Sequence, residues 1–260
     1  MPDGTGFVFM GGVPRSGLTL LRRLLMGHTH IHCGPDTGLP TSIAMQWKNF
    51  HDTLGTLHKT EFGLAPGQVR NVMADLLTGL IGEPLKSDGI RVLVEKTSLN
   101  ILAFKPLATL LPGARFVHVV RDGRDVAASL LQRDWCDANG QPFAHVSDPR
   151  AALDYWNGLA GLGLDAETEL KARCLRLKYE DLVRAPKRTL TSLLRFMDLD
   201  FDAGVFDAPD EAVFTALERD SLPRLLGPVV KTRIGDGRAL AAHLTEPVRA
   251  RLRLLGYRVD

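Results

Sequence analysis

The stretch that decides the fold is Phe7–Thr19, which reads FVFMGGVPRSGLT. Its apolar run Phe7–Met10 is typical of a buried strand, and it ends at a Gly-Gly pair. A second glycine-containing turn leads into Leu18–Met26, whose apolar residues lie on several faces, as in a helix packed on a sheet. A strand, a glycine-rich turn and a helix in this order are typical of a phosphate-binding loop.

In such a loop, backbone N–H groups at the helix N-terminus bind the anion and the helix dipole favours it. The spacing of Gly12, Gly17 and Thr19 equals that of nucleoside triphosphatases. Leu18, however, stands where those proteins have the lysine that reaches the β- and γ-phosphates. Leu18 therefore argues against ordinary ATP or GTP hydrolysis, and Arg15 supplies a cation within the loop instead. The alternative is a glycine-rich turn that binds no ligand.

Three more strands are expected, at residues 91–94, 115–120 and 174–179, with helices at 99–111, 124–131 and 186–197. Strands separated by helices imply crossover connections and a parallel sheet. We therefore predict an α/β fold in which residues 1–260 form one domain with helices on both faces of the sheet. Residues 38–88 and 134–170 are expected to be helical insertions that wall a substrate pocket. Residues 200–240 are expected to form a long loop region, and a helix over 247–255 to follow it.

Composition excludes several classes of protein. The 260 residues carry a formal net charge of only +2, too small to indicate bulk binding to nucleic acid or to a membrane surface. The cysteines Cys33, Cys136 and Cys174 have no metal-ligand spacing, which favours free thiols in a reducing compartment. No stretch approaches the ~20 apolar residues of a membrane span, and no signal peptide is recognised before Phe7. We therefore expect a cytoplasmic protein, and the sequence leaves homo-oligomerisation open.

A second motif lies at Val119–Leu130, which reads VVRDGRDVAASL. Arg121 stands at the expected carboxyl end of a strand, the edge where open α/β sheets bind ligands. Ser129 follows about two helical turns later. An arginine fork and a helical hydroxyl in this arrangement suit one phosphate group. Taken alone, the motif is equally compatible with a solvated turn held by local ion pairs.

Together the two motifs resemble a known family. Gly12–Thr19 is similar to the 5′-phosphosulfate loop of sulfotransferases that use 3′-phosphoadenosine 5′-phosphosulfate, and Val120–Leu130 is similar to their 3′-phosphate motif. The wording is closest to tyrosylprotein sulfotransferases and their bacterial relatives, with Leu18 the departure between Gly12 and Leu20. Residues 40–88 match poorly, whereas further matches are His28, Cys33–Gly34, Glu95–Thr97, Leu111–Ala114, Trp156–Asn157, Tyr179–Leu182 and Leu255–Tyr257.

This resemblance implies a P-loop, nucleotide-kinase-like fold and transfer of a sulfuryl group to an acceptor hydroxyl, with 3′,5′-adenosine bisphosphate as the product. No metal ion is expected, because the chain shows no His/Cys ligand cluster and arginine and lysine can neutralise the leaving group. The nucleotide-binding positions that it implies are Arg15, Ser16, Gly17, Leu18 and Thr19 for the 5′ end, Arg121, Ser129 and Arg133 for the 3′-phosphate, and Tyr179. Lys231 and Arg233 belong to Lys231–Arg238, which resembles a late basic loop that closes over the nucleotide; the alternative is a solvated loop.

The acceptor hydroxyl must lose a proton, so a base is expected within hydrogen-bond reach. The cytosolic small-molecule enzymes place a histidine after their Lys-Thr pair, but here Ser98 follows Lys96–Thr97. The tyrosylprotein branch uses a glutamate in the sequence CGEET, and the matching Cys33–Thr37 reads CGPDT. The resemblance therefore makes Asp36 the candidate base, with His28, His32 and His118 as weaker candidates.

Asp36 has an alternative role, and two cations are candidates for stabilising the leaving group. Asp36 also suits the N-cap of a helix that begins near Thr37. Lys96, at the end of an expected strand beside the phosphate loop, suits the charge that develops on the bridging oxygen, and Arg15 can share that role.

The acceptor is the least constrained part of the prediction. No arginine follows Asp36 until Arg70, which speaks against the recognition of acidic peptides. Met45–His51 offers an aromatic wall suited to a phenol or natural-product alcohol, or it is simply helix core. A protein tyrosine is the alternative acceptor. The competing functions are a P-loop nucleotide kinase and a nucleotide-binding protein without catalysis.

Overall fold

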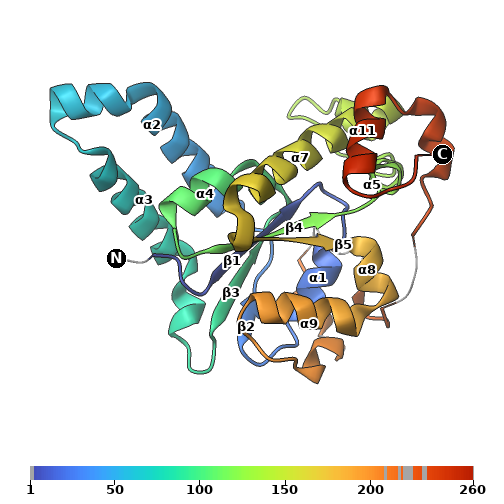
Figure 1. The fold of residues 1–260 in the computed structure, drawn as a ribbon, viewed down its shortest axis with the longest axis horizontal. Helices are drawn as coiled ribbons and strands as arrows, with labels where there is room; N and C mark the ends of the chain where they lie inside the picture. Colours follow the sequence, from blue (N-terminus) through green and yellow to red (C-terminus); the bar gives the residue numbers. More distant parts are fainter. Residues whose placement is uncertain (1–2, 208–209, 216–217, 219–224, 230–232, 260) are drawn as a thin grey trace.

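A five-stranded parallel sheet organises the structure, a computed structural model that describes residues 3–207, 210–215, 218, 225–229 and 233–259. The strand order is β2-β3-β1-β4-β5, and all four neighbouring pairs are parallel (Figure 1). The strands are β1 (Phe7–Gly12), β2 (Ile31–Cys33), β3 (Val92–Lys96), β4 (Arg115–Val120) and β5 (Cys174–Lys178). The predicted α/β fold with a parallel sheet is confirmed, and the short edge strand β2 is an addition that the sequence pattern did not indicate.

Helices cover both faces of the sheet. One face packs against α4 (Phe104–Leu110), α5 (Gly123–Leu130), α7 (Pro149–Leu170) and α11 (Glu246–Leu254) (Figure 1). The other face packs against α1 (Leu18–Leu25), α8 (Tyr179–Arg184) and α9 (Pro186–Phe196). The other helices among the described residues are α2 (Leu39–Phe62), α3 (Pro66–Ile81), α6 (Ala144–Ser147) and the 3₁₀ helices η1 (Glu83–Lys86), η2 (Ser98–Leu102), η3 (Lys171–Arg173), η4 (Ala203–Phe206), η5 (Glu211–Val213) and η7 (Arg238–His243).

The alternation of side chains along each strand explains the two buried layers. In β1, Phe7 and Phe9 enter the core on the α7 face, whereas Val8 and Met10 enter the core on the α1 face. Phe9 stacks on Phe116 of β4 with ring centroids 5.8 Å apart. Because both faces are covered, the central strand β1 reads as a continuous apolar run, whereas the edge strand β5 (CLRLK) alternates.

The helix expected over 99–111 is interrupted. It consists of η2 and α4, with Ala103 between them at φ −117° and ψ 7°. The side-chain amide of Asn100 donates to the Met10 carbonyl and to the Glu95 carboxylate, which attaches η2 to the sheet. The sequence pattern predicts one helix here, but the structure has two, and the first of them is attached to the sheet by Asn100.

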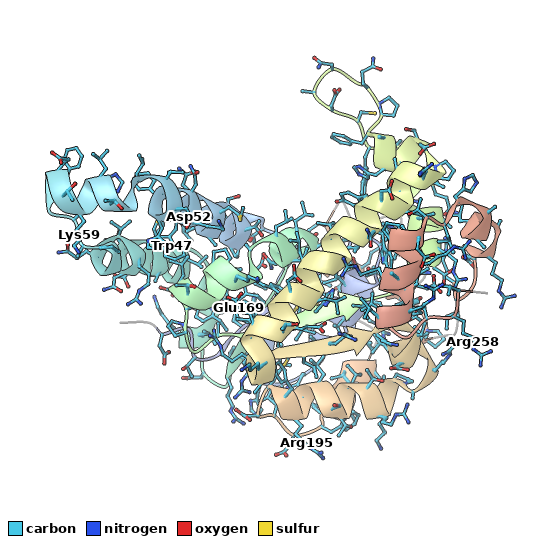
Figure 2. The ribbon with its side chains drawn as sticks, turned by 45° about the horizontal axis from the view of Figure 1, so that its top comes forward. Trp47, Asp52, Lys59, Glu169, Arg195 and Arg258 are labelled. Carbon is cyan, nitrogen blue, oxygen red and sulfur yellow. The ribbon has the colours of Figure 1, made fainter. Side chains whose placement is uncertain are left out.

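The two predicted insertions differ in character. The α2–α3 hairpin projects away from the sheet as an arm (Figures 1 and 2). By contrast, α7 is a central helix of the fold, since it packs on α4, α5 and α11 and buries Trp156 and Leu153. The interpretation of 134–170 as an insertion is wrong for α7. Within the described residues, no helix is long and apolar enough to span a bilayer.

Candidate active site

The phosphate loop lies between the end of β1 and the start of α1. Arg15 and Gly17 have positive φ angles of 77° and 99°, so the loop turns sharply before the helix. A Cβ at Gly17 would lie 2.4 Å from Cδ2 of Tyr179, so a side chain is excluded there by contact as well as by conformation. The first turn of α1 contains no acidic residue, so its N-terminal amides form a site suited to an anion.

A cavity of about 620 Å³ opens over this loop. It is lined from the carboxyl ends of β3 and β4, from the phosphate loop and from the region of α6 and α7. Most of the site residues predicted from the sequence meet there: Arg15, Gly17, Leu18, Thr19, Asp36, Lys96, Arg121, Ser129, Tyr179 and Arg233.

Arg121 connects the two sequence motifs. This side chain is only 4% exposed, and its guanidinium donates to the Arg15 carbonyl at 3.1 Å. It also lies over the Tyr179 ring, 4.5 Å from the centroid. In turn, Nε of Arg15 donates to the Ser129 hydroxyl at 3.1 Å. Cationic side chains from both motifs therefore converge on one end of the cavity.

The late glycine-containing loop closes on the same end. Arg121 donates to the Arg233 carbonyl, while the Asp125 carboxylate accepts from the amides of Gly235 at 2.9 Å and Gly237 at 2.8 Å. A Cβ at Gly237 would lie 2.0 Å from the Arg124 carbonyl oxygen, so only glycine fits this approach. Sequence reasoning missed the role of Asp125, although it is the second aspartate of the RDGRD motif.

Three of the predicted nucleotide ligands are not among the described residues that line the cavity. Ser16 is fully buried, its amide donates to the Val13 carbonyl, and it is not among the described residues that line the cavity. Ser16 thus belongs to the frame of the tight loop, and its prediction as a direct ligand is not supported by this geometry. Arg133 is half-buried and also does not line the cavity. Lys231 lies outside the described residues.

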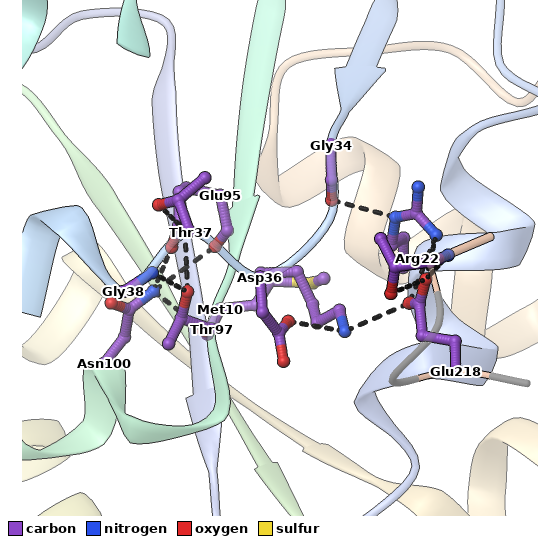
Figure 3. Close-up of polar contacts among 12 residues, drawn as sticks. Met10, Arg22, Gly34, Asp36, Thr37, Gly38, Glu95, Thr97, Asn100 and Glu218 are labelled. Carbon is purple, nitrogen blue, oxygen red and sulfur yellow. Dashed lines mark hydrogen bonds and ion pairs between the residues drawn. The ribbon is translucent and has the colours of Figure 1, made fainter. Parts of the chain in front are cut away.

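Lys96 and Asp36 form an ion pair in the wall of the same cavity. The Lys96 ammonium lies 2.5 Å from Oδ1 of Asp36, with the lysine side chain 2% exposed and the aspartate 37% exposed (Figure 3). Asp36 does not cap α2, because α2 starts after Gly38 and has no side-chain cap. The alternative role for Asp36 is therefore excluded, and its partly exposed carboxylate faces the cavity.

Glu95 secures the loop that carries Asp36. Its carboxylate accepts from the hydroxyls of Thr37 at 2.8 Å and Thr97 at 2.7 Å and from the Asn100 amide (Figure 3). These bonds join the loop after β2 to the end of β3. The relative position of Asp36 and Lys96 is thereby defined by a buried hydrogen-bond network.

Glu218 is a site residue that sequence reasoning missed. This buried carboxylate lines the cavity and lies 3.4 Å from the Lys96 ammonium and 3.1 Å from the Arg22 guanidinium. Burial opposes its ionisation, but hydrogen bonds from Thr215 and the charges of Lys96 and Arg22 outweigh this, so the pKa of Glu218 lies below its ordinary value. No motif in the sequence marks it, because its partners are 122 and 196 residues away.

An aromatic wall, which we define as Trp135, Phe143, His145 and Tyr155, lines the cavity beside α7. The His145 ring stacks on Tyr155 with centroids 4.2 Å apart and on Phe143 with centroids 5.4 Å apart. Burial lowers the pKa of His145 and raises the pKa of Tyr155, which favours the neutral form of both groups at neutral pH. This wall is therefore uncharged and suited to an apolar or aromatic ligand.

The expected wall at Met45–His51 is wrong. Trp47 packs in the core beneath α2, and Phe50 and His51 border a separate small pocket between α2 and α3. No described residue from 40 to 88 lines the main cavity, so the α2–α3 arm does not wall the pocket. The alternative, that these residues belong to the helix core, is confirmed for Trp47, because its side chain is buried in the hydrophobic core.

The histidines considered as bases lie elsewhere. His118 is buried in β4 with Nδ1 2.6 Å from Glu167, and His28 contacts the Asp200 carbonyl at 3.1 Å. Neither these nor His32 are among the described residues that line the cavity. All three cysteines are free, and burial raises the pKa of Cys33 to about 12, so its thiol stays protonated. The described residues contain no cluster of side chains suited to a metal ion.

Asp125→Ala tests the closure of the late loop. Because two amides lose a charged acceptor, hydrogen exchange in residues 233–240 is expected to accelerate about tenfold or more, as measured by mass spectrometry. Asp236→Ala is the matched control, since Asp236 is 45% exposed and its ion pair with Arg233 is long, at 3.8 Å. Equal exchange in both variants and the wild type would contradict the anchoring role.

Comparison with known proteins identifies relatives over most of the chain. The family model "Sulfotransferase family" matches residues 8–203. Protein-tyrosine sulfotransferase A of Caenorhabditis elegans is 25% identical over 96% of this chain and 67% of that protein. Protein-tyrosine sulfotransferase 1 of Danio rerio is 30% identical over 76% of this chain. The chain spans only 54% of the length of the Danio rerio protein.

Solved structures agree with this family at the level of fold. The sulfotransferase domain of the Synechococcus PCC 7002 olefin synthase superposes with a TM-score of 0.73 at 19% identity, covering 100% of this chain and 98% of that one. The sulfotransferase domain from the curacin biosynthetic pathway gives the same TM-score and identity, with 100% and 99% coverage. Because the family model covers most of the sequence and the fold agrees, the chain belongs to the sulfotransferase family.

Proposed function

We propose that the protein transfers a sulfuryl group from 3′-phosphoadenosine 5′-phosphosulfate to the hydroxyl of a small phenol or alcohol. One observation carries this proposal: the phosphate loop, the Arg121–Ser129 pair and the Lys96–Asp36 pair all line one cavity. The family match supports the type of reaction. The donor is inferred from the resemblance of the two motifs to sulfotransferases that use it, and the acceptor from the chemistry of the lining residues.

The donor has anionic groups at both ends, and the cavity offers cationic groups to match. The amides at the start of α1 and the Arg15 side chain suit the 5′-phosphosulfate. Arg121 and Ser129 suit the 3′-phosphate, which a guanidinium binds in bidentate fashion. Tyr179 and Arg233 border the same end. Leu18 offers its backbone amide only, since its side chain joins the core on the α1 face.

The transfer step is an in-line displacement. The acceptor oxygen forms a bond to sulfur while the bond from sulfur to the bridging phosphate oxygen breaks. The acceptor proton passes to the Asp36 carboxylate, and 3′,5′-adenosine bisphosphate leaves with the electron pair of the broken bond. Lys96 and Arg15 stabilise the negative charge on the leaving oxygen, so positioning and electrostatics supply most of the acceleration.

The aromatic wall supports a small apolar acceptor. Trp135 and Phe143 are 36% and 42% exposed and both line the cavity, so their rings are accessible to an apolar ligand. The cations among the described lining residues are Arg15, Lys96, Arg121 and Arg233, all of them engaged at the donor end or with Asp36. A tyrosine in a peptide is the second candidate acceptor, which the names of the relatives favour.

Arg121→Lys tests the donor site. Lysine keeps the charge but loses the fork that contacts both the Arg15 carbonyl and the anion, so affinity for 3′,5′-adenosine bisphosphate is expected to fall about tenfold or more. Isothermal titration calorimetry measures it, with Arg195→Lys on α9 as the control. If the wild-type protein does not bind this nucleotide, the proposed donor is wrong.

Asp36→Asn tests the base. The amide cannot accept the acceptor proton, so kcat is expected to fall by about 10²- to 10⁴-fold while affinity for 3′,5′-adenosine bisphosphate changes little. Transfer of ³⁵S-labelled sulfate from the donor to 4-nitrophenol provides the rate. An unchanged kcat would remove Asp36 from the mechanism.

Phe143→Ala tests the acceptor wall. Loss of one ring from the stack is expected to raise KM for 4-nitrophenol about tenfold, with nucleotide affinity unchanged, because ring contacts contribute about 1 kcal/mol beyond buried area. Leu162→Ala is the control, since Leu162 is 43% exposed on α7 and does not line the cavity. Wild-type transfer to a tyrosine peptide but to no phenol in a small-molecule panel would favour the second candidate.

A further inference from the structure

Glu218 brings a buried negative charge to the transfer site from a distant part of the chain. Its side chain is 6% exposed and lines the same cavity as Asp36 and Lys96. The proposed chemistry assigns it no part. A carboxylate buried this deeply requires partners, because desolvation of a charge is costly.

Two groups hold the Glu218 carboxylate on the side away from Lys96. Its Oε2 atom accepts from the amide of Thr215 at 3.0 Å, from the Thr215 hydroxyl at 3.1 Å and from Arg22 at 3.1 Å. Its Oε1 atom is shared between Arg22 at 3.2 Å and Lys96 at 3.4 Å. The carboxylate is therefore anchored by one oxygen and presents the other to Lys96.

Arg22 links this carboxylate to the loop that carries Asp36. The Nε atom of Arg22 donates to the carbonyl of Gly34, two residues before Asp36, at 2.8 Å (Figure 3). One terminal nitrogen of Arg22 bonds Glu218, and the second donates to the Val213 carbonyl at 3.0 Å. The guanidinium also lies 5.6 Å from the Phe214 ring centroid. One buried side chain on α1 thus sets the positions of both carboxylates around Lys96.

Two carboxylates and two cations pair with one another at this end of the cavity. Asp36 and Glu218 contribute two negative charges, and Lys96 and Arg22 contribute two positive charges. Glu95 is the remaining acidic group nearby, and its oxygens are engaged by Thr37, Thr97 and Asn100. Without Glu218, Lys96 would retain Asp36 as its carboxylate partner, and a carboxylate held by an unshared ammonium is a weak proton acceptor.

We propose that Glu218 is a positioning residue of the transfer site: anchored by Arg22, it offers Lys96 a second carboxylate at 3.4 Å, which competes with the 2.5 Å contact between Lys96 and Asp36 and weakens the lysine's hold on the base. The effect on catalysis rests on the proposed function, in which Asp36 is the base. When negative charge develops on the donor, Lys96 can turn to it, because Glu218 remains neutralised by Arg22. The Asp36 carboxylate is then free of the lysine and can take the proton from the acceptor hydroxyl.

The first test measures the base directly. In Glu218→Gln the amide oxygen keeps an acceptor for Thr215 and Arg22, but the negative charge is lost. The ¹³C NMR titration of the Asp36 carboxyl, assigned with Asp36→Asn, is expected to shift to lower pH by about one unit relative to wild type. Glu211→Gln is the matched control, since Glu211 is an exposed carboxylate of the same segment. A titration that is unchanged or shifted to higher pH would overturn the proposal, and this readout needs no acceptor.

The second test separates positioning from a purely structural role. With 4-nitrophenol as acceptor, Glu218→Gln is expected to lower kcat about tenfold and to move the acidic limb of its pH profile downward, with KM and nucleotide affinity nearly unchanged. Glu218→Asp retains the charge and is expected to recover the pH profile. A uniform loss of melting temperature, nucleotide affinity and kcat in both variants would overturn the proposal. Failure of the wild type to bind 3′,5′-adenosine bisphosphate would instead refute the proposed function and leave the titration result standing.

Discussion

The hydrogen bond from the Arg121 guanidinium to the Arg15 carbonyl is the contact on which the arrangement of the site depends. It attaches the end of β4 to the phosphate loop at the end of β1, the strand beside it in the sheet. The same guanidinium stacks on Tyr179 and donates to the Arg233 carbonyl, so it also orders α8 and the late loop. The indole of Trp156 donates to the Arg121 carbonyl and fixes the backbone from the α7 side. A buried arginine with these partners is costly to desolvate, and an anionic ligand at the same place adds the missing countercharge.

Electrostatics differs between the two ends of the cavity. At the Arg121 end, the described lining side chains are cationic or neutral, and the arginines donate to backbone carbonyls and to the Ser129 hydroxyl. At the Lys96 end, cations and carboxylates balance within a few ångströms. Breaking one partner of such a buried pair costs about 3–5 kcal/mol, more than an exposed pair contributes. The first end is therefore suited to binding a multiply charged anion, and the second to moving a proton without a large change in net charge.

Much of the sheet and its helices could be predicted because the relevant signals are local. Continuous apolar strands, the glycine turn and the helix after it lie within Phe7–Leu25, and the structure has β1 and α1 there. The errors arose where local pattern and tertiary contact disagree. The apolar residues of α2 indicated a pocket wall, but Trp47 satisfies them by packing on the helices of the arm and core. Ser16 matches a ligand position and is fully buried in the tight turn, and its role as a ligand stays a prediction.

The sequence by itself determined four of the five strands and the helices next to them, the phosphate loop, and the residue types at both anion-binding motifs, because each is encoded by neighbours within about ten positions. Only the tertiary structure decided that Asp36 faces Lys96 instead of capping a helix, that Asp125 holds the late loop, and that Glu218 and Arg22 complete the charge balance. The physical reason is distance along the chain. Electrostatic and hydrogen-bond partners that lie far apart along the chain leave no periodicity or spacing in the sequence, and they meet only when the sheet brings its strand ends together.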